Sequence, residues 1–104
     1  FIFVKDGTKL VKVKLDEILY IEGLKDYVTI QTLNQKIVTL QRLKSLEEQL
    51  PANKFIRIHN SYIVSLDAID VIQKNEVQIR GVVLPVGDTY RKAFKEFIER
   101  NHIQ

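Results

Sequence analysis

The stretch Phe55-Ile56-Arg57-Ile58-His59-Asn60-Ser61-Tyr62-Ile63-Val64-Ser65 places a small polar pair between two runs rich in β-branched and aromatic residues. Such runs favour strands, whereas Asn and Ser favour turns because their side chains can bond the nearby backbone. We therefore predict two strands, or one strand bent in the middle, with an exposed polar turn at Asn60-Ser61. Residues 51–66 include no acid, so we expect a positive local field that suits an anionic partner.

The rest of the chain, taken outward from this stretch, predicts a meander of short strands. Turns between them are indicated by Asp6-Gly7, Asn34-Gln35, Lys74-Asn75 and Gly81, because these residues tolerate or favour the backbone angles of tight turns. Pro85 lacks an N–H group, so the last strand should lie at a sheet edge or end there. Besides the central pair, the strands are expected at residues 1–5, 8–14, 18–22, 27–32, 36–39, 76–80, 82–86 and at the end of 66–72.

Two segments have helical periodicity. The first is a short amphipathic helix ahead of the helix-breaking Pro51, predicted from a leucine stripe that faces the core: Leu40, Leu43, Leu46 and Leu50. The second begins at 87–89 and closes the domain, and its apolar face consists of Tyr90, Phe94, Phe97 and Ile98. Asp88 could accept hydrogen bonds from the free N–H groups of its first turn. His102, at its end, is expected to do no more than favour the helix dipole.

Composition sets limits on what the chain can do. Its 104 residues, 45% hydrophobic and 28% charged, suit one ordinary globular domain, 1–104, and the absence of cysteine excludes disulfides and thiolate chemistry. With two histidines we expect no metal site, and no cofactor. No apolar run approaches the ~20 residues of a membrane span, and no signal peptide is visible, so we expect a cytoplasmic protein without membrane contact. A chain without Met that starts at Phe1 is expected to be part of a larger protein.

Three blocks of sequence occur in a fixed order along almost the whole chain. They are Leu19-Tyr20-Ile21-Glu22 before a polar loop and Tyr27-Val28; Phe55-x-Arg57-x-His59-x-Ser61-Tyr62-x-Val64; and Leu84-Pro85-Val86 ahead of Thr89-Tyr90-Arg91-Lys92. This order resembles the LytTR DNA-binding domain of bacterial response regulators. The resemblance implies a mainly β, elongated fold of short antiparallel sheets, about ten strands in all, with one short internal helix and a C-terminal helix. Loops, and not a recognition helix, would enter successive major grooves.

The resemblance also implies which residues would touch DNA. Asn60 suits bidentate pairing with adenine and Lys25 can reach guanine, while Asp88 either accepts from cytosine N4 or only caps the last helix. A structural role in a hydrogen bond is the alternative for His59. The expected base contacts are Lys25, Asp26, Tyr27, Asn60 and Asp88. The expected phosphate contacts are Arg42, Lys44, His59, Ser61, Thr89, Arg91 and Lys92.

The function implied is sequence-specific binding of double-stranded DNA by the output domain of a two-component transcriptional response regulator. A receiver domain would lie upstream, outside this chain, and a second copy would bind tandem sites spaced by whole helical turns. The alternative is a β-rich protein- or peptide-interaction module that does not bind DNA. We expect no catalytic residues, because His59 and Ser61 on one strand would be about 6.6 Å apart, too far for a nucleophile–base pair.

Overall fold

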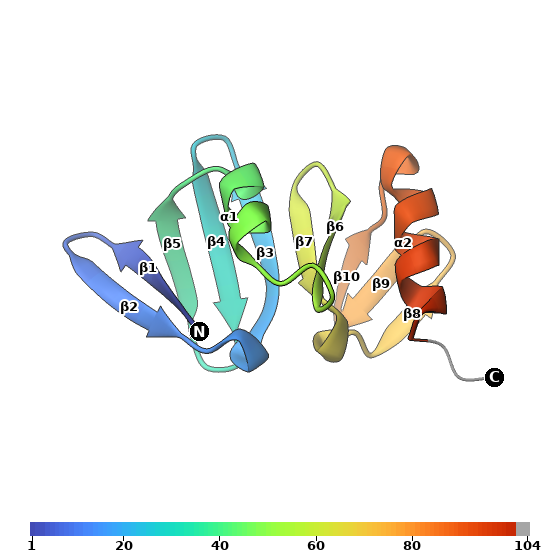
Figure 1. Cartoon of the computed structure of the whole chain (residues 1–104), viewed down its shortest axis with the longest axis horizontal. Helices are drawn as coiled ribbons and strands as arrows, with labels where there is room; N and C mark the ends of the chain where they lie inside the picture. The colour runs from blue at the N-terminus through green and yellow to red at the C-terminus, as the bar shows by residue number, and fades with distance from the viewer. Residues whose placement is uncertain (102–104) are drawn as a thin grey trace.

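In the computed structural model, which describes residues 1–101, ten strands form three antiparallel sheets (Figure 1). The strands are β1 (Ile2–Asp6), β2 (Lys9–Val13), β3 (Ile18–Leu24), β4 (Tyr27–Thr32), β5 (Lys36–Leu40), β6 (Phe55–His59), β7 (Tyr62–Ser65), β8 (Val71–Gln73), β9 (Glu76–Ile79) and β10 (Val82–Pro85). β1 and β2 form a hairpin, the central sheet has the order β5-β4-β3-β7-β6, and the third sheet has the order β10-β9-β8. The mainly β fold predicted from the sequence is confirmed, whereas the prediction for His102 falls outside the described residues.

The turns occur where the sequence predicts them. Gly7, with φ 65°, lies between β1 and β2, and Asn75 and Gly81, with φ 62° and 81°, connect the strands of the third sheet. Positive φ is strained for most side chains but not for glycine, and Asn tolerates it well. Pro85 ends β10 at the edge of its sheet, where its missing N–H costs no ladder hydrogen bond.

The central sheet has hydrophobic residues on both faces where β3, β7 and β6 lie side by side. Ile21 and Ile63 belong to one core with the β1–β2 hairpin, while Leu19 and Val64 belong to a second core with the third sheet. Strands buried on both faces have continuous apolar runs and not strict alternation. This double burial explains the run Ile18-Leu19-Tyr20-Ile21 and makes the sheet the common wall of the two halves.

Each core is covered by a helix. α1 (Leu43–Gln49) buries Leu43 and Leu46 in the first core, and α2 (Arg91–Glu99) buries Phe94 in the second. The predicted leucine stripe is wrong at Leu40, which ends β5 and is 70% exposed, because β5 continues to this residue and the helix starts only after it. Within residues 1–101, no helix is both long enough and apolar enough to cross a membrane.

The molecule is elongated, with extents of 46 × 24 × 24 Å. Figure 1 shows three connections at the same long edge, the upper one in the view: β3 to β4, β6 to β7, and β10 to α2. The opposite edge carries the short helical turns that lead into β3 and follow β7. The sequence-predicted polar loops are therefore brought to one side of the protein.

Candidate nucleic-acid interface

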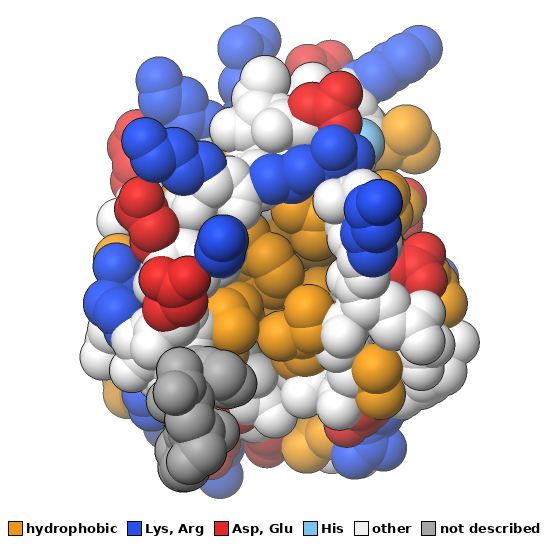
Figure 2. Space-filling view, turned by 90° about the vertical axis from the view of Figure 1, so that its right-hand side faces the viewer, with side chains coloured by type: hydrophobic (Ala, Val, Ile, Leu, Met, Phe, Trp, Pro, Cys, Tyr) orange, Lys and Arg blue, Asp and Glu red, His pale blue; other side chains and the backbone are white. Residues whose placement is uncertain are grey.

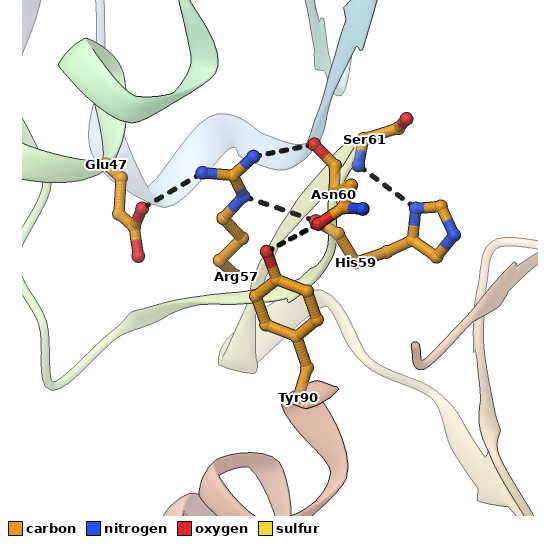
Figure 3. Close-up of polar contacts among 6 residues, drawn as sticks. All are labelled: Glu47, Arg57, His59, Asn60, Ser61 and Tyr90. Carbon is orange, nitrogen blue, oxygen red and sulfur yellow. Dashed lines mark hydrogen bonds and ion pairs between the residues drawn. The ribbon is translucent and has the colours of Figure 1, made fainter. Parts of the chain in front are cut away.

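The middle connection is the Asn60-Ser61 turn between β6 and β7, and it is held from several sides (Figure 3). Arg57 donates from Nη2 to the main-chain carbonyl of Asn60 (2.7 Å) and from Nε to that of His59 (3.3 Å). The main-chain N–H of Ser61 donates to His59 Nδ1 (3.0 Å). These bonds fix the backbone of the turn without using the side chains of Asn60 or Ser61.

Tyr90 and Glu47 come to the same turn from other elements. The Tyr90 hydroxyl donates to Asn60 Oδ1 at 2.9 Å, and the Arg57 guanidinium lies 6.0 Å from the centre of the Tyr90 ring. Glu47, on α1, pairs with Arg57 at 3.5 Å between Oε1 and Nη1. Figure 3 shows Arg57 between Glu47 on one side and the turn on the other. The arrangement joins α1, β6 and the start of α2 around one exposed amide.

His59 is half-buried, and it forms the structural hydrogen bond that was given above as the alternative to a phosphate contact. Because its Nδ1 accepts from Ser61, the proton of the neutral imidazole resides on Nε2, which is left as a donor. An added Cβ at Gly87 would lie 3.4 Å from His59 Cδ2, so the ring also packs against the β10–α2 connection. The bond does not decide whether His59 contacts phosphate, which stays a prediction.

The β3–β4 turn at Lys25-Asp26 lies next to the Asn60-Ser61 turn but is built differently. The two turns are joined at their bases, where the Gly23 N–H donates to the Ser61 carbonyl at 2.8 Å. Lys25 adopts φ 57° although it is not glycine. Among residues 1–101, none forms a side-chain hydrogen bond or ion pair with Lys25, Asp26 or Tyr27. This turn therefore presents its side chains free to solvent.

A hollow of about 410 Å³ lies between these two turns and the start of α1. It brings together several of the residues predicted to touch DNA, and Arg57 in addition. Its cations come from separate parts of the sequence, and Asp26 contributes one negative charge to the wall. The lining residues are Gly23, Lys25, Asp26, Arg42, Leu43, Lys44, Arg57, Asn60 and Ser61.

The third connection is a single 3₁₀ turn, η3 (Asp88–Tyr90), that leads directly into α2. The predicted cap at Asp88 is wrong: within the described chain no side chain caps either helical segment, and α2 begins only at Arg91. Asp88 Oδ1 instead pairs with Arg91 Nη2 at 2.7 Å. The ion pair partly neutralises one of the predicted phosphate contacts, while Thr89 and Lys92 remain exposed beside it.

Tyr27 is separated from the other predicted base contacts. It is 53% exposed and lines a different hollow, together with Lys5, Val38 and Leu40, on the open face of the central sheet. The register pairs Tyr27 with both Leu24 and Leu40, which places three exposed apolar side chains in one row across β3, β4 and β5. A contact of Tyr27 with a base stays a prediction, and the structure does not group it with Asn60.

The sequence did not single out Tyr90, Arg57 or Glu47 as parts of a site. For Arg57 a local signal existed. Its two acceptors are the carbonyl oxygens two and three residues further along the chain, within reach of a long side chain with several donors. No comparable signal existed for Tyr90, which lies 30 residues from Asn60 and was assigned to the apolar face of a helix. Glu47 likewise approaches the turn only because α1 packs beside β6.

At the end of the molecule, α2 and the third sheet leave an apolar hollow of about 440 Å³. Figure 2 shows this hollow with Lys and Arg side chains around it and more of them, with acids interspersed, along the upper edge that bears the three connections. Its lining includes the apolar residues Ile72, Val86, Phe94 and Ile98, and Arg91 is one of its charged lining residues. The hollow therefore borders the candidate interface but has different chemistry.

A β-rich domain that gathers polar turns and cations along one edge has the architecture of a nucleic-acid-binding domain that uses loops. Comparison with known proteins then identifies the family. The LytTr DNA-binding domain family matches residues 8–99, and the chain belongs to this family. It is a family of DNA-binding domains and not a class of enzymes.

Two relatives and one solved structure illustrate the match. The chain is 32% identical over 95 residues to the sensory transduction protein LytT of Bacillus cereus, covering 86% of this chain and 39% of that protein. It is 32% identical over 101 residues to the transcriptional regulatory protein LytR of Staphylococcus aureus, covering 91% and 41%. The chain thus spans about two fifths of these relatives.

A LytTr DNA-binding domain from Bacillus cereus has the same fold, with a TM-score of 0.81 at 21% identity. The match covers 93% of this chain and 94% of that one. At this level of identity the likeness concerns the path of the backbone and not the individual contacts. The three-sheet arrangement is therefore that of the family.

Proposed function

We propose that this chain binds double-stranded DNA sequence-specifically, as the output domain of a two-component transcriptional response regulator in the cytoplasm. The observation that carries the proposal is the shared edge: three polar connections lie along it, and one presents Asn60 on a backbone fixed by Arg57. Loops placed in this way can enter grooves while the sheets stay outside the duplex. A receiver domain in the remainder of the protein would control the activity.

The geometry of the edge supports a particular set of proposed contacts. Asn60 offers an amide to adenine, and Lys25, on the neighbouring turn, offers an ammonium to guanine. The hollow between the two turns would seat a backbone phosphate, because Arg42 and Lys44 enter it from the α1 side. At the third connection, Thr89 and Lys92 are exposed and would hold a further phosphate.

The length of the edge limits how copies would share one DNA. A molecule 46 Å long that lies along a duplex covers roughly 13 base pairs at about 3.4 Å each. Two copies on the same face at one helical turn, about 34–36 Å between centres, would overlap. A second copy would therefore bind a tandem site two turns away, about 21 base pairs.

Selection from a randomised duplex library, followed by binding titrations at several salt concentrations, tests the proposal. We expect an enriched motif and an affinity for it that falls steeply with salt, because each phosphate contact releases counterions. Tandem motifs should occur about 21 base pairs apart. Binding without any enriched motif would contradict sequence-specific recognition, and the absence of salt-dependent binding would favour the peptide-interaction alternative.

A further inference from the structure

The side-chain amide of Asn60 is already engaged before any DNA is bound. The Tyr90 hydroxyl donates to Asn60 Oδ1 at 2.9 Å, from an element that lies 30 residues further along the chain. Figure 3 shows the phenol pointing from the start of α2 toward the amide at the tip of the turn. A base-contacting residue is thereby linked to a helix that is not part of its own hairpin.

We propose that Tyr90 is a positioning residue that holds the Asn60 amide and so sets the base preference of the β6–β7 turn. The inference rests on the proposed function, because it concerns how one contact to DNA is oriented. Tyr90 itself need not touch a base. Its hydroxyl acts through Asn60, whose side-chain amide has no other hydrogen bond within residues 1–101.

Hydrogen-bonding capacity connects this contact to specificity. An amide oxygen has two lone pairs, so Oδ1 can accept from Tyr90 and still accept once more, while both Nδ2 hydrogens remain available. This remaining set matches adenine, which presents the N7 acceptor beside the N6 donor in the major groove. Guanine presents two acceptors, N7 and O6, and a held Oδ1 would face one of them. Without the hydroxyl, the amide could rotate and offer Nδ2 to guanine.

Packing places the Tyr90 hydroxyl and leaves it little freedom. The ring is half-buried against the second core, and the preceding Gly87 donates its N–H to the Ile58 carbonyl at 2.8 Å. An added Cβ at Gly87 would lie 3.4 Å from Tyr90 Cδ2, so a side chain at this position would press against the ring. Arg57 holds the main chain of Asn60 from the other side. The Tyr90 ring and the Asn60 main chain are therefore held without this bond, and the bond itself orients only the Asn60 side-chain amide.

The test is Tyr90→Phe, which keeps the packed ring and removes only the hydroxyl. Binding is measured on duplexes with A·T or G·C at the position where Asn60→Ala reduces selectivity. We expect the preference for adenine over guanine to fall roughly three- to tenfold, the effect of one hydrogen bond, with affinity for random DNA within about twofold of wild type. In an Asn60→Ala background, Tyr90→Phe should change the preference no further.

Tyr62→Phe is the matched control, because it also removes one phenol hydroxyl, from the same hairpin, where it bonds Glu22 and not the tip of the turn. It should leave the adenine preference unchanged. In the DNA-free protein, the NMR signals of the Asn60 side-chain NH₂ should shift in Tyr90→Phe and stay in place in Tyr62→Phe. Unchanged signals together with an unchanged preference in Tyr90→Phe would overturn the positioning role, even if wild type binds its motif selectively. A wild-type protein without any base preference would instead overturn the proposed function and this inference together.

Discussion

The two turns that border the central hollow lie side by side but differ in how they are held. The Asn60-Ser61 turn is bonded by Arg57, His59 and Tyr90, whereas the Lys25-Asp26 turn has no side-chain bond within residues 1–101 and adopts a positive φ at Lys25. Their bases are nevertheless joined, through Gly23 and Ser61. One turn is fixed before DNA arrives, and the other is free to adapt.

A fixed turn and a free turn suit two different tasks of a DNA-binding loop, which are recognition of a base and attraction to the charged duplex. A short polar side chain such as Asn must be placed accurately to form two hydrogen bonds with one base, so a fixed backbone favours selectivity. A long flexible cation such as Lys can find a phosphate or a guanine from many positions, so it gains less from a fixed backbone. We therefore expect substitutions at the fixed turn to change selectivity more than substitutions at the free turn do.

The largest effect is expected for Asn60→Ala. It should weaken binding to the selected motif by about 1–3 kcal/mol, because the proposed bidentate contact to a base is lost, and leave random DNA nearly unchanged. Arg91→Ala, which removes a proposed phosphate contact, should weaken both DNAs by similar factors. Titrations of each variant on both duplexes decide the matter. Equal losses for Asn60→Ala on the two DNAs would remove the contrast between the turns.

Arg57→Lys should have the next largest effect. Lys keeps the charge but has no fork to reach two carbonyl oxygens, so the turn should loosen. We expect the motif to be bound about 1 kcal/mol more weakly with little change on random DNA, and faster hydrogen exchange at the amide of Ser61. An equal loss on both DNAs would mean that Arg57 serves as a phosphate contact and not as the support of the turn.

The sequence predicted those parts of the molecule that depend on neighbours along the chain. The ten strands and their turns follow from β-forming runs interrupted by residues such as Gly7 and Asn75, and the polar turn at Asn60-Ser61 is a signal of the same kind. The helical stripe failed at Leu40 because a leucine at the end of a strand can continue a helical spacing by coincidence. On β5 this side chain faces outward in a row with Tyr27.

The side-chain contacts that hold the candidate interface, such as the bond between Tyr90 and Asn60, could not be predicted in the same way. Tyr90 and Asn60 meet only because α2 packs on β6, and a tyrosine on an apolar helical face gives no sign of its hydroxyl's partner. The prediction that Asp88 caps the last helix was wrong for a related reason. An extra 3₁₀ turn precedes α2, and the Asp88 carboxylate forms an ion pair with Arg91 instead. Pairings of this kind are set by tertiary structure, which local patterns do not contain.

Lys25→Gly tests the free turn through stability. Glycine adopts φ 57° without strain, so the free energy of unfolding should rise by about 0.5–1 kcal/mol while DNA affinity falls with the lost charge. Arg80→Gly is the matched control, since Arg80 has φ 47° and lies in a hollow with Asp16 and Asp67, away from the three connections. It should not change DNA binding. Denaturant unfolding and DNA titration of both variants are the measurements, and a destabilised Lys25→Gly would show that Lys25 makes a contact that its exposed position does not indicate.

The smallest effect at neutral pH is expected at Tyr62, whose hydroxyl donates to Glu22 Oε2 at 3.2 Å below the two turns. Burial, and then the charge and hydrogen bond of Glu22, raise the pKa of Tyr62 above its ordinary value of 10.0. Because the folded protein holds this proton more tightly than the unfolded chain, the resulting stabilisation is complete below pH 10 and is lost as the pH rises from 10 through the raised pKa.

The free energy of unfolding should therefore decline in this alkaline range, and it should decline less steeply in Tyr62→Phe. Glu22→Gln should remove only part of the decline, because burial remains the larger cause. Identical declines in wild type and Tyr62→Phe would show that the raised pKa of Tyr62 does not contribute to the free energy of unfolding.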